Sequence, residues 1–201
     1  MTPAIENVVF DMGNVLMTFD GRSFSRSFTD TEDDAALLHA ALFGRTEWVL
    51  LDAGAISHDT MRRVAENHLP ERLIPNLHAC LEGWPHQSRP IDGVCDLVPR
   101  LKDAGYGLYL LSNASTSIDR QLAHCPVYPL MDGRVVSGFE RMMKPDPAIF
   151  RLLCSRYGLE PSSCLFVDDN EDNCRGAEAA GMQAFHFTGD AAPLERMLLE
   201  A

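Results

Sequence analysis

The order of hydrophobic and polar positions begins with a strand that ends on a carboxylate. Val8, Val9 and Phe10 form an apolar run within residues 5–12, and the run stops at Asp11 before a short turn. An unbroken apolar run of this length is typical of a parallel strand that is buried on both faces of a sheet. We therefore expect Asp11 to lie at the carboxyl edge of a sheet, where open α/β sheets bind their ligands.

A helical period replaces the strand pattern between residues 18 and 86. Capping residues precede the apolar stretches, and glycine or proline follows them, as at the two ends of helices. The segment therefore predicts a small bundle of short helices inserted after the first strand. The expected helices run from a capping box at Thr29 and Glu32 to Gly44, from Thr46 to Gly54, from Ser57 to about Asn67, and from about Ile74 to Trp84.

From residue 91 onward, strand and helix patterns alternate, which is the order that builds a parallel sheet covered by helices. Together with the first strand, this order predicts an α/β fold with a doubly wound parallel sheet. The expected strands cover residues 106–111, about 126–130, 163–167 and 183–187, with a turn at Asp132-Gly133. The expected helices cover 92–103, about 116–123, about 147–157 and 172–180, and an amphipathic helix follows from about Pro193.

Composition and charge restrict the possible partners. The 201 residues are 46% hydrophobic, enough for a folded core, and the formal net charge is −12. Nucleic acids and anionic membranes bind basic surfaces, so we expect neither as a main partner, whereas a small anionic substrate needs only a local positive site. The six cysteines lack zinc-site spacing, and the sequence has no signal peptide or long apolar span, so we expect reduced thiols and a cytoplasmic location.

Polar side chains follow three of the expected strands at the same relative position. Asp11 follows the first, Ser112 and Asn113 follow the second, and Asp168 and Asp169 follow the fourth. Because parallel strands end at one edge of the sheet, these residues can converge although they are far apart along the chain. Lys144 stands between the second and third groups in sequence, at the start of a helix and beside a proline.

These residue types suit the transfer of a phosphoryl group. Crowded carboxylates raise one another's pKa, and a lysine or a divalent cation relieves the repulsion. Carboxylate, carbonyl and water oxygens are the ligands that Mg²⁺ prefers. A carboxylate such as Asp11 can then act as a nucleophile on phosphorus, and Ser112, the amides near Asn113 and Lys144 can hold the phosphoryl oxygens. Hydrolysis of a phosphomonoester needs positioning and charge stabilisation of this kind.

Four segments in order resemble the motifs of the haloacid dehalogenase-like hydrolase superfamily. They are Phe10-Asp11-x-Gly-Asn, Leu-Ser112-Asn113, Lys144-Pro-Asp-Pro and Phe-Val-Asp168-Asp169-Asn170. The details are similar to the small sugar phosphatases of the glucose-1-phosphate phosphatase type. The resemblance implies a Rossmannoid α/β core domain of residues 1–16 and 87–201, with a helical cap domain of residues 17–86. It also implies a Mg²⁺-dependent phosphatase that acts on a small phosphorylated metabolite, with a sugar phosphate as one candidate.

The same resemblance implies a role for each motif residue. Asp11 would be the nucleophile that becomes phosphorylated, Ser112 would bind the transferring group, and Lys144 would neutralise both. Asn113 would contact the phosphate through its backbone or its side chain. The ligands implied for Mg²⁺ are the carboxylates of Asp11 and Asp169, Asp168 directly or through water, and the backbone carbonyl of Gly13.

Gly13 is a departure from the family pattern. Phosphatases of this superfamily usually carry a second aspartate at this position, which serves as general acid and base for the leaving group. General acid catalysis typically contributes ~10²–10⁴-fold in rate, so we expect a slow enzyme or a substitute acid. Asp20 is one candidate for that substitute, and its alternative reading is a helix cap or a solvated charge. Asp172 could likewise support Lys144 or the metal ligands, or serve only as an early-helix acid.

Two other functions remain open. One is a metal-independent 2-haloacid dehalogenase, which also lacks the second aspartate but does not need the paired acids Asp168 and Asp169. The other is a weakly catalytic member that binds a phosphorylated ligand or has a regulatory role, which only Gly13 supports. Trp48 and Trp84 could stack on a sugar or could simply pack the short helices together.

Overall fold

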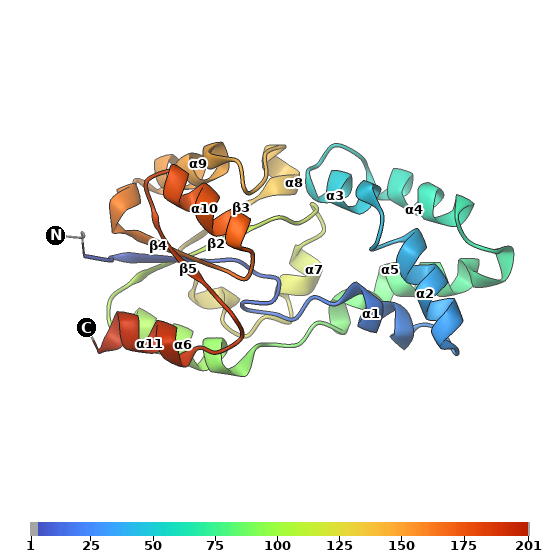
Figure 1. Ribbon diagram of the computed structural model, residues 1–201, viewed down its shortest axis with the longest axis horizontal. Coiled ribbons are helices and arrows are strands. Elements are labelled where there is room, and N and C mark those ends of the chain that lie inside the picture. Colours follow the sequence, from blue (N-terminus) through green and yellow to red (C-terminus); the bar gives the residue numbers. More distant parts are fainter. Residues whose placement is uncertain (1–3, 201) are drawn as a thin grey trace.

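Five parallel strands form one sheet in the order β3-β2-β1-β4-β5 in the computed structural model, which describes residues 4–200 (Figure 1). β1 is central, and Val8 pairs with Leu108 on one side and with Leu165 on the other. The expected doubly wound α/β fold is thereby confirmed. The strands are β1 Asn7–Phe10, β2 Gly107–Ser112, β3 Gly133–Val136, β4 Cys164–Asp168 and β5 Gln183–His186.

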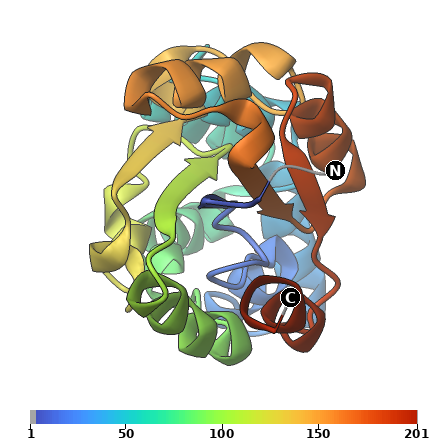
Figure 2. The same ribbon diagram turned by 90° about the vertical axis from the view of Figure 1, so that its left-hand side faces the viewer.

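Helices cover both faces of the sheet, as Figure 2 shows. Alternate residues of a strand point to opposite faces, so Val8 and Phe10 join one buried cluster and Val9 joins the other. The first cluster lies under α6 (Asp92–Asp103) and α11 (Ala192–Leu199), and the second lies under α9 (Pro147–Tyr157) and α10 (Glu171–Ala179). This burial on both faces explains the unbroken apolar run of β1.

Five further helices lie beyond the carboxyl edge of the sheet, at the right of Figure 1. They have a buried cluster of their own, which includes Leu38, Leu51, Met61 and Leu77. We call this part of the chain, residues 21–86, the helical region. None of the helices in the described part of the chain is long and apolar enough to cross a membrane. The helices are α1 Gly21–Ser27, α2 Glu32–Ala41, α3 Thr46–Asp52, α4 His58–Asn67 and α5 Ile74–Gly83.

The strand expected at 126–130 is wrong. That segment contains the 3-10 helix Tyr128–Leu130, and the third strand is 133–136, which begins at the expected turn. Asp132 explains the difference, because its backbone N–H donates to Leu108 O and its carboxylate accepts from Leu108 N. These bonds attach the chain to β2, so the polar pair Asp132-Gly133 leads into a strand.

Two helix boundaries also differ from the sequence patterns. The cap of α2 is Thr31, whose hydroxyl accepts from Asp34 N, and the expected capping residue Thr29 donates its hydroxyl to Ser25 O at the end of α1. The helix expected at 116–123 is shortened to α7, Asp119–Leu122. Ser115 restrains the chain before it, because its Oγ lies 3.0 Å from Ser117 Oγ.

Candidate active site

Asp11 lies directly after the central strand. Its backbone N–H donates to Val167 O at 2.9 Å, which fixes it beside the end of β4. The chain then turns back, because Leu16 N and Met17 N both donate to Met12 O. Asn14 occupies the left-handed region in this turn, with φ of 55°, a conformation that asparagine tolerates better than most residues. The turn holds Asp11 at the carboxyl edge of the sheet.

Lys144 bridges two carboxylates at this edge. Its Nζ lies 2.8 Å from Asp11 Oδ1 and 2.6 Å from Asp168 Oδ2, and all three residues are buried. Burial raises the pKa of Asp11 to about 6; the charge of Lys144 opposes this rise and the charge of Asp168 adds to it. Burial would lower the pKa of Lys144, but Asp11 and Asp168 together hold it above its ordinary value. Lys144 is therefore charged at neutral pH.

Two asparagines fix this ion-paired group. Asn113 Nδ2 donates to Lys144 O and Lys144 N donates to Asn113 Oδ1, each at 2.9 Å, around a cis peptide bond between Lys144 and Pro145. Asn173 Nδ2 donates to both oxygens of Asp168 at 3.1 Å. Sequence reasoning missed Asn173, although its place on the first turn of the helix after Asp168 was a usable signal. The sequence also left open whether Asn113 would contact phosphate through its backbone or its side chain. In the structure its side chain is hydrogen-bonded to the backbone of Lys144.

Three carboxylates can meet around one cation. Oxygen atoms of Asp11, Asp168 and Asp169 lie within 4.8 Å of one another. Asp169 is held by Asn14 Nδ2, at 3.1 Å from Oδ2. Asp168 is different, because its oxygens already accept from Lys144, Asn173 and the backbone N–H of Asn170. This all-oxygen donor set suits Mg²⁺, with Asp11 and Asp169 having the freer carboxylates.

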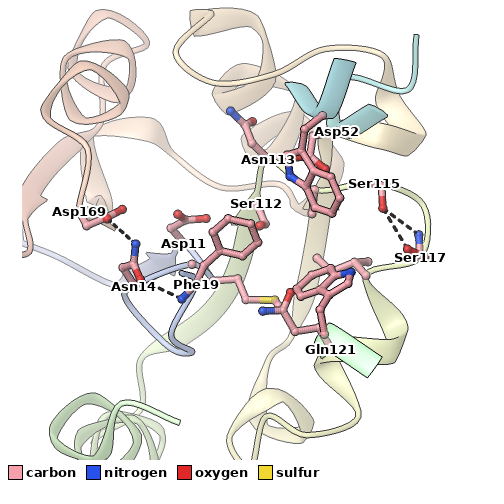
Figure 3. Close-up of a pocket in the computed structure, with 16 residues that line it drawn as sticks. Asp11, Asn14, Phe19, Asp52, Ser112, Asn113, Ser115, Ser117, Gln121 and Asp169 are labelled. Atoms are coloured by element: carbon pink, nitrogen blue, oxygen red, sulfur yellow. Dashed lines mark hydrogen bonds between the residues drawn. The ribbon is translucent and has the colours of Figure 1, made fainter. Parts of the chain in front are cut away.

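A cavity of about 210 Å³ opens above these groups (Figure 3). Its polar side includes Asp11, Ser112 and Asp169, which the sequence placed together. The cavity also has an aromatic lining, which includes Trp48 and Trp84 from the helical region. The two indoles also pack against each other, with ring centroids 5.8 Å apart. The other lining residues are Met12, Gly13, Asn14, Phe19, Asp52, Asn113, Ala114, Ser115, Ser117, Ile118 and Gln121.

Two acids that the sequence raised as candidates do not line this cavity. Asp20 is the N-cap of α1, and its exposed carboxylate accepts from Arg22 N and Ser23 N. Asp172 is exposed on the first turn of α10, where it lies 3.6 Å from Arg175. Asp20 is therefore a helix cap and Asp172 an early-helix acid, which were the alternatives to an active-site role. Asp52, which sequence reasoning missed, does line the cavity.

Comparisons with known proteins show which proteins this chain resembles. The model of the haloacid dehalogenase-like hydrolases matches residues 5–181. The sesquiterpene phosphatase astK of Aspergillus oryzae is 26% identical over 195 residues, which cover 96% of this chain and 94% of that protein. The (S)-2-haloacid dehalogenase 4A of Burkholderia cepacia is 27% identical over 101 residues, 50% of this chain and 44% of that protein.

A solved structure shares the fold over its full length. It is a HAD family enzyme of Bacteroides thetaiotaomicron, in a magnesium complex, with a TM-score of 0.75 and 21% identity, covering 96% of this chain and 100% of that one. The same enzyme in complex with magnesium and inorganic phosphate gives a TM-score of 0.69 at 21% identity, over 90% and 93% of the two chains.

Proposed function

Because this chain belongs to the haloacid dehalogenase-like hydrolases, we propose that it is a Mg²⁺-dependent phosphatase. In this proposal it hydrolyses a small phosphomonoester through an aspartyl-phosphate intermediate on Asp11. The observation that carries the proposal is the meeting of Asp11, Lys144 and Asp168 at one edge of the sheet, beside Asp169 and Ser112. Three carboxylates and one lysine this close together are costly to bury for packing alone. Their grouping therefore supports a site that binds an anion and a cation.

The residues divide the work of phosphoryl transfer among them. Asp11 is the nucleophile, and Lys144 keeps its carboxylate ionised and neutralises charge that develops on the phosphoryl oxygens. Ser112 Oγ donates to the phosphoryl group. The side chain of Asn113 is engaged with Lys144, so its share in phosphate binding falls to its backbone.

Mg²⁺ would be held by the carboxylates of Asp11 and Asp169 and by the backbone carbonyl of Gly13. Asp168 would contribute through water or through its hold on Lys144, because both of its oxygens already accept hydrogen bonds. When bound, the cation supplies positive charge that offsets the crowded carboxylates and the phosphate. Magnesium in the solved structures of the Bacteroides enzyme supports this assignment.

The aromatic side of the cavity indicates the leaving group. Phe19, Trp48 and Trp84 offer apolar ring faces that can contact the CH face of a sugar or an isoprenoid chain. A second cavity of about 440 Å³ shares both tryptophans with the first and is lined by apolar side chains such as Leu51 and by charged ones such as Arg62 and Arg120. We therefore propose a phosphomonoester with an apolar face, either a sugar phosphate or an isoprenoid phosphate, and the name of the Aspergillus relative supports the second class.

A substrate screen tests the proposal. Purified protein is incubated with Mg²⁺ and a panel of sugar, isoprenoid and aryl monophosphates, and released phosphate is measured, with Asp11→Asn as the blank. We expect phosphate release that EDTA abolishes and that Asp11→Asn lacks, together with an acid-stable but base-labile phosphoryl label on the wild-type protein. Halide released from a 2-haloacid in the presence of EDTA, without phosphatase activity, would instead establish a dehalogenase.

A further inference from the structure

The cavity needs a proton donor that its core residues do not provide. An alcohol leaving group departs as an alkoxide unless it receives a proton, and general acid catalysis of that step contributes ~10²–10⁴-fold. Gly13 has no side chain to give a proton. Among the described residues that line the cavity, only Asp11, Asp52 and Asp169 carry a titratable group. In the proposed function Asp11 and Asp169 would face the phosphoryl group and the metal, which leaves Asp52.

Asp52 enters the cavity from the side opposite to the nucleophile. It is the last residue of α3, in the helical region, and lines the cavity together with Ser112 and Asn113 (Figure 3). With Asp11 as the nucleophile, the phosphoryl group would lie against the core edge, and the leaving oxygen of an in-line transfer would point away from Asp11 toward the helical region. A carboxyl on α3 is therefore on the side where the proton is needed.

The core fixes the position of Asp52. Ser137 Oγ donates to Asp52 O and accepts from Ala114 N at 2.9 Å, so a single hydroxyl joins α3 to the loop after β2. Two residues further on, Gly54 has φ of 67° and packs so closely on Gly138 that a Cβ would collide with the Gly138 carbonyl oxygen. The carboxyl is thus presented by a segment that touches the core at Asp52 itself and again at Gly54.

The surroundings of Asp52 keep a proton on it near neutral pH. Burial raises the pKa of Asp52 to about 7, and a hydrogen bond from the backbone of Ser115 partly opposes the rise. Most charged groups on the surrounding elements are ion-paired: Glu47 of α3 with Arg45, and Glu140 of α8 (Ser137–Glu140) with Arg156. On α4, Arg62 pairs with Asp59 and Glu66, and on α7, Arg120 pairs with Glu82. His58 of α4 is the neighbouring imidazole, and its pKa is lowered by burial and by the charge of Arg120. Asp119 of α7 pairs with Arg134, and the other titratable groups facing the cavity are Asp11 and Asp169.

We propose that Asp52 is the general acid and base of the reaction, in place of the aspartate that Gly13 lacks. This proposal rests on the proposed phosphatase function. In the first step an oxygen of Asp11 attacks phosphorus, the bond from phosphorus to the leaving oxygen breaks, and that oxygen takes the proton of Asp52. In the second step the Asp52 carboxylate takes a proton from water as the water oxygen attacks phosphorus. The bond to Asp11 then breaks, which releases inorganic phosphate and restores protonated Asp52.

A comparison of leaving groups tests the role of Asp52. kcat/KM is measured for an alkyl phosphate from the screen and for p-nitrophenyl phosphate, whose leaving group is stable without a proton. Asp52→Asn should lower the ratio of alkyl to aryl kcat/KM by ~10²–10⁴-fold, because only the alkyl substrate loses an acid that it needs. Asp20→Asn is the matched control, since Asp20 is an exposed aspartate that caps α1 just before the helical region, and asparagine can also cap a helix.

Each outcome has one meaning. An unchanged ratio in a folded and active Asp52→Asn protein overturns the role of Asp52 and leaves the phosphatase proposal intact. A wild-type protein that hydrolyses neither substrate overturns both proposals. A fall of the ratio in Asp20→Asn equal to that in Asp52→Asn also overturns the assignment to Asp52. The second expected result concerns pH. In the wild type, kcat/KM for the alkyl phosphate should fall as the pH rises through about 7, and in Asp52→Asn this fall should be absent.

Discussion

Replacement of Lys144 by methionine should destabilise the protein through the carboxylates that it leaves behind. The lysine side chain is 1% exposed, and its partners Asp11 and Asp168 are 12% and 0% exposed. Removing one partner of a buried ion pair costs about 3–5 kcal/mol, because the remaining charge is desolvated and unpaired. In a domain of 150–250 residues, each 1 kcal/mol lowers Tm by about 2–4 °C, so Lys144→Met should melt about 6–20 °C below wild type.

The charges then predict what restores the lost stability. Burial has already raised the pKa of Asp11 to about 6, so without the lysine this carboxyl takes up a proton and Asp168 carries most of the penalty. Lys144→Met/Asp168→Asn should therefore melt above the single variant. Mg²⁺ should raise the Tm of Lys144→Met, because a ligand that binds only the folded state stabilises it.

Thermal unfolding followed by circular dichroism, in EDTA and then in excess Mg²⁺, measures these changes. Arg175→Met is the matched control, because Arg175 makes an exposed ion pair with Glu171 on α10, and such pairs contribute about 0–1 kcal/mol. The reasoning is refuted if Lys144→Met melts no lower in EDTA than Arg175→Met does. It is also refuted if Lys144→Met/Asp168→Asn melts below Lys144→Met.

Three further predictions concern α3 and its contacts. The pKa of Asp52 is raised from 3.8 to about 7 in the folded protein, so protonation stabilises the fold at low pH and this contribution is lost as the pH rises from about 4 to about 7. Thermal melts should therefore give equal Tm values for Asp52→Asn and wild type at pH 4 and a higher Tm for the variant at pH 8; the opposite order would contradict the burial argument. With p-nitrophenyl phosphate, rapid-mixing kinetics of Asp52→Asn should show a burst of nitrophenol, because water attack on the aspartyl-phosphate has lost its base. Gly54→Ala should lower stability by about 1–3 kcal/mol and reduce alkyl phosphate turnover, because alanine is strained at φ of 67° and collides with Gly138; wild-type denaturation midpoints and rates would show that α3 adjusts freely.

The sequence predicted the core edge of the site better than its opposite wall. Asp11 directly follows β1, and Ser112 and Asp168 are the last residues of β2 and β4. Because the parallel arrangement alone brings strand ends together, their meeting could be derived without coordinates. The bounds of α4 and α9 could also be predicted, because Ser57 and Asp146 are side-chain caps that act within three residues.

The remaining features depend on contacts between distant parts of the chain. Asp52 looks like any aspartate at a helix end until α3 packs on the loop after β2, which lies more than 60 positions further along the sequence. The third strand was misplaced for the same reason, because Asp132 is held by Leu108 of a neighbouring strand and not by its own turn. Local pattern therefore located Asp11, which we propose as the nucleophile, and missed Asp52, which we propose to serve the leaving group.

The hydroxyl of Ser137 has a consequence for the timing of turnover. It binds the last carbonyl of α3 and the amide of Ala114 at once. A swing of α3 away from the sheet would break that bond and withdraw Asp52 from the cavity in the same movement. An open enzyme would then hold its nucleophile and its cation but have no proton to deliver. Under the role proposed for Asp52, proton transfer to the leaving group would thus require the position of α3 that the Ser137 hydroxyl holds.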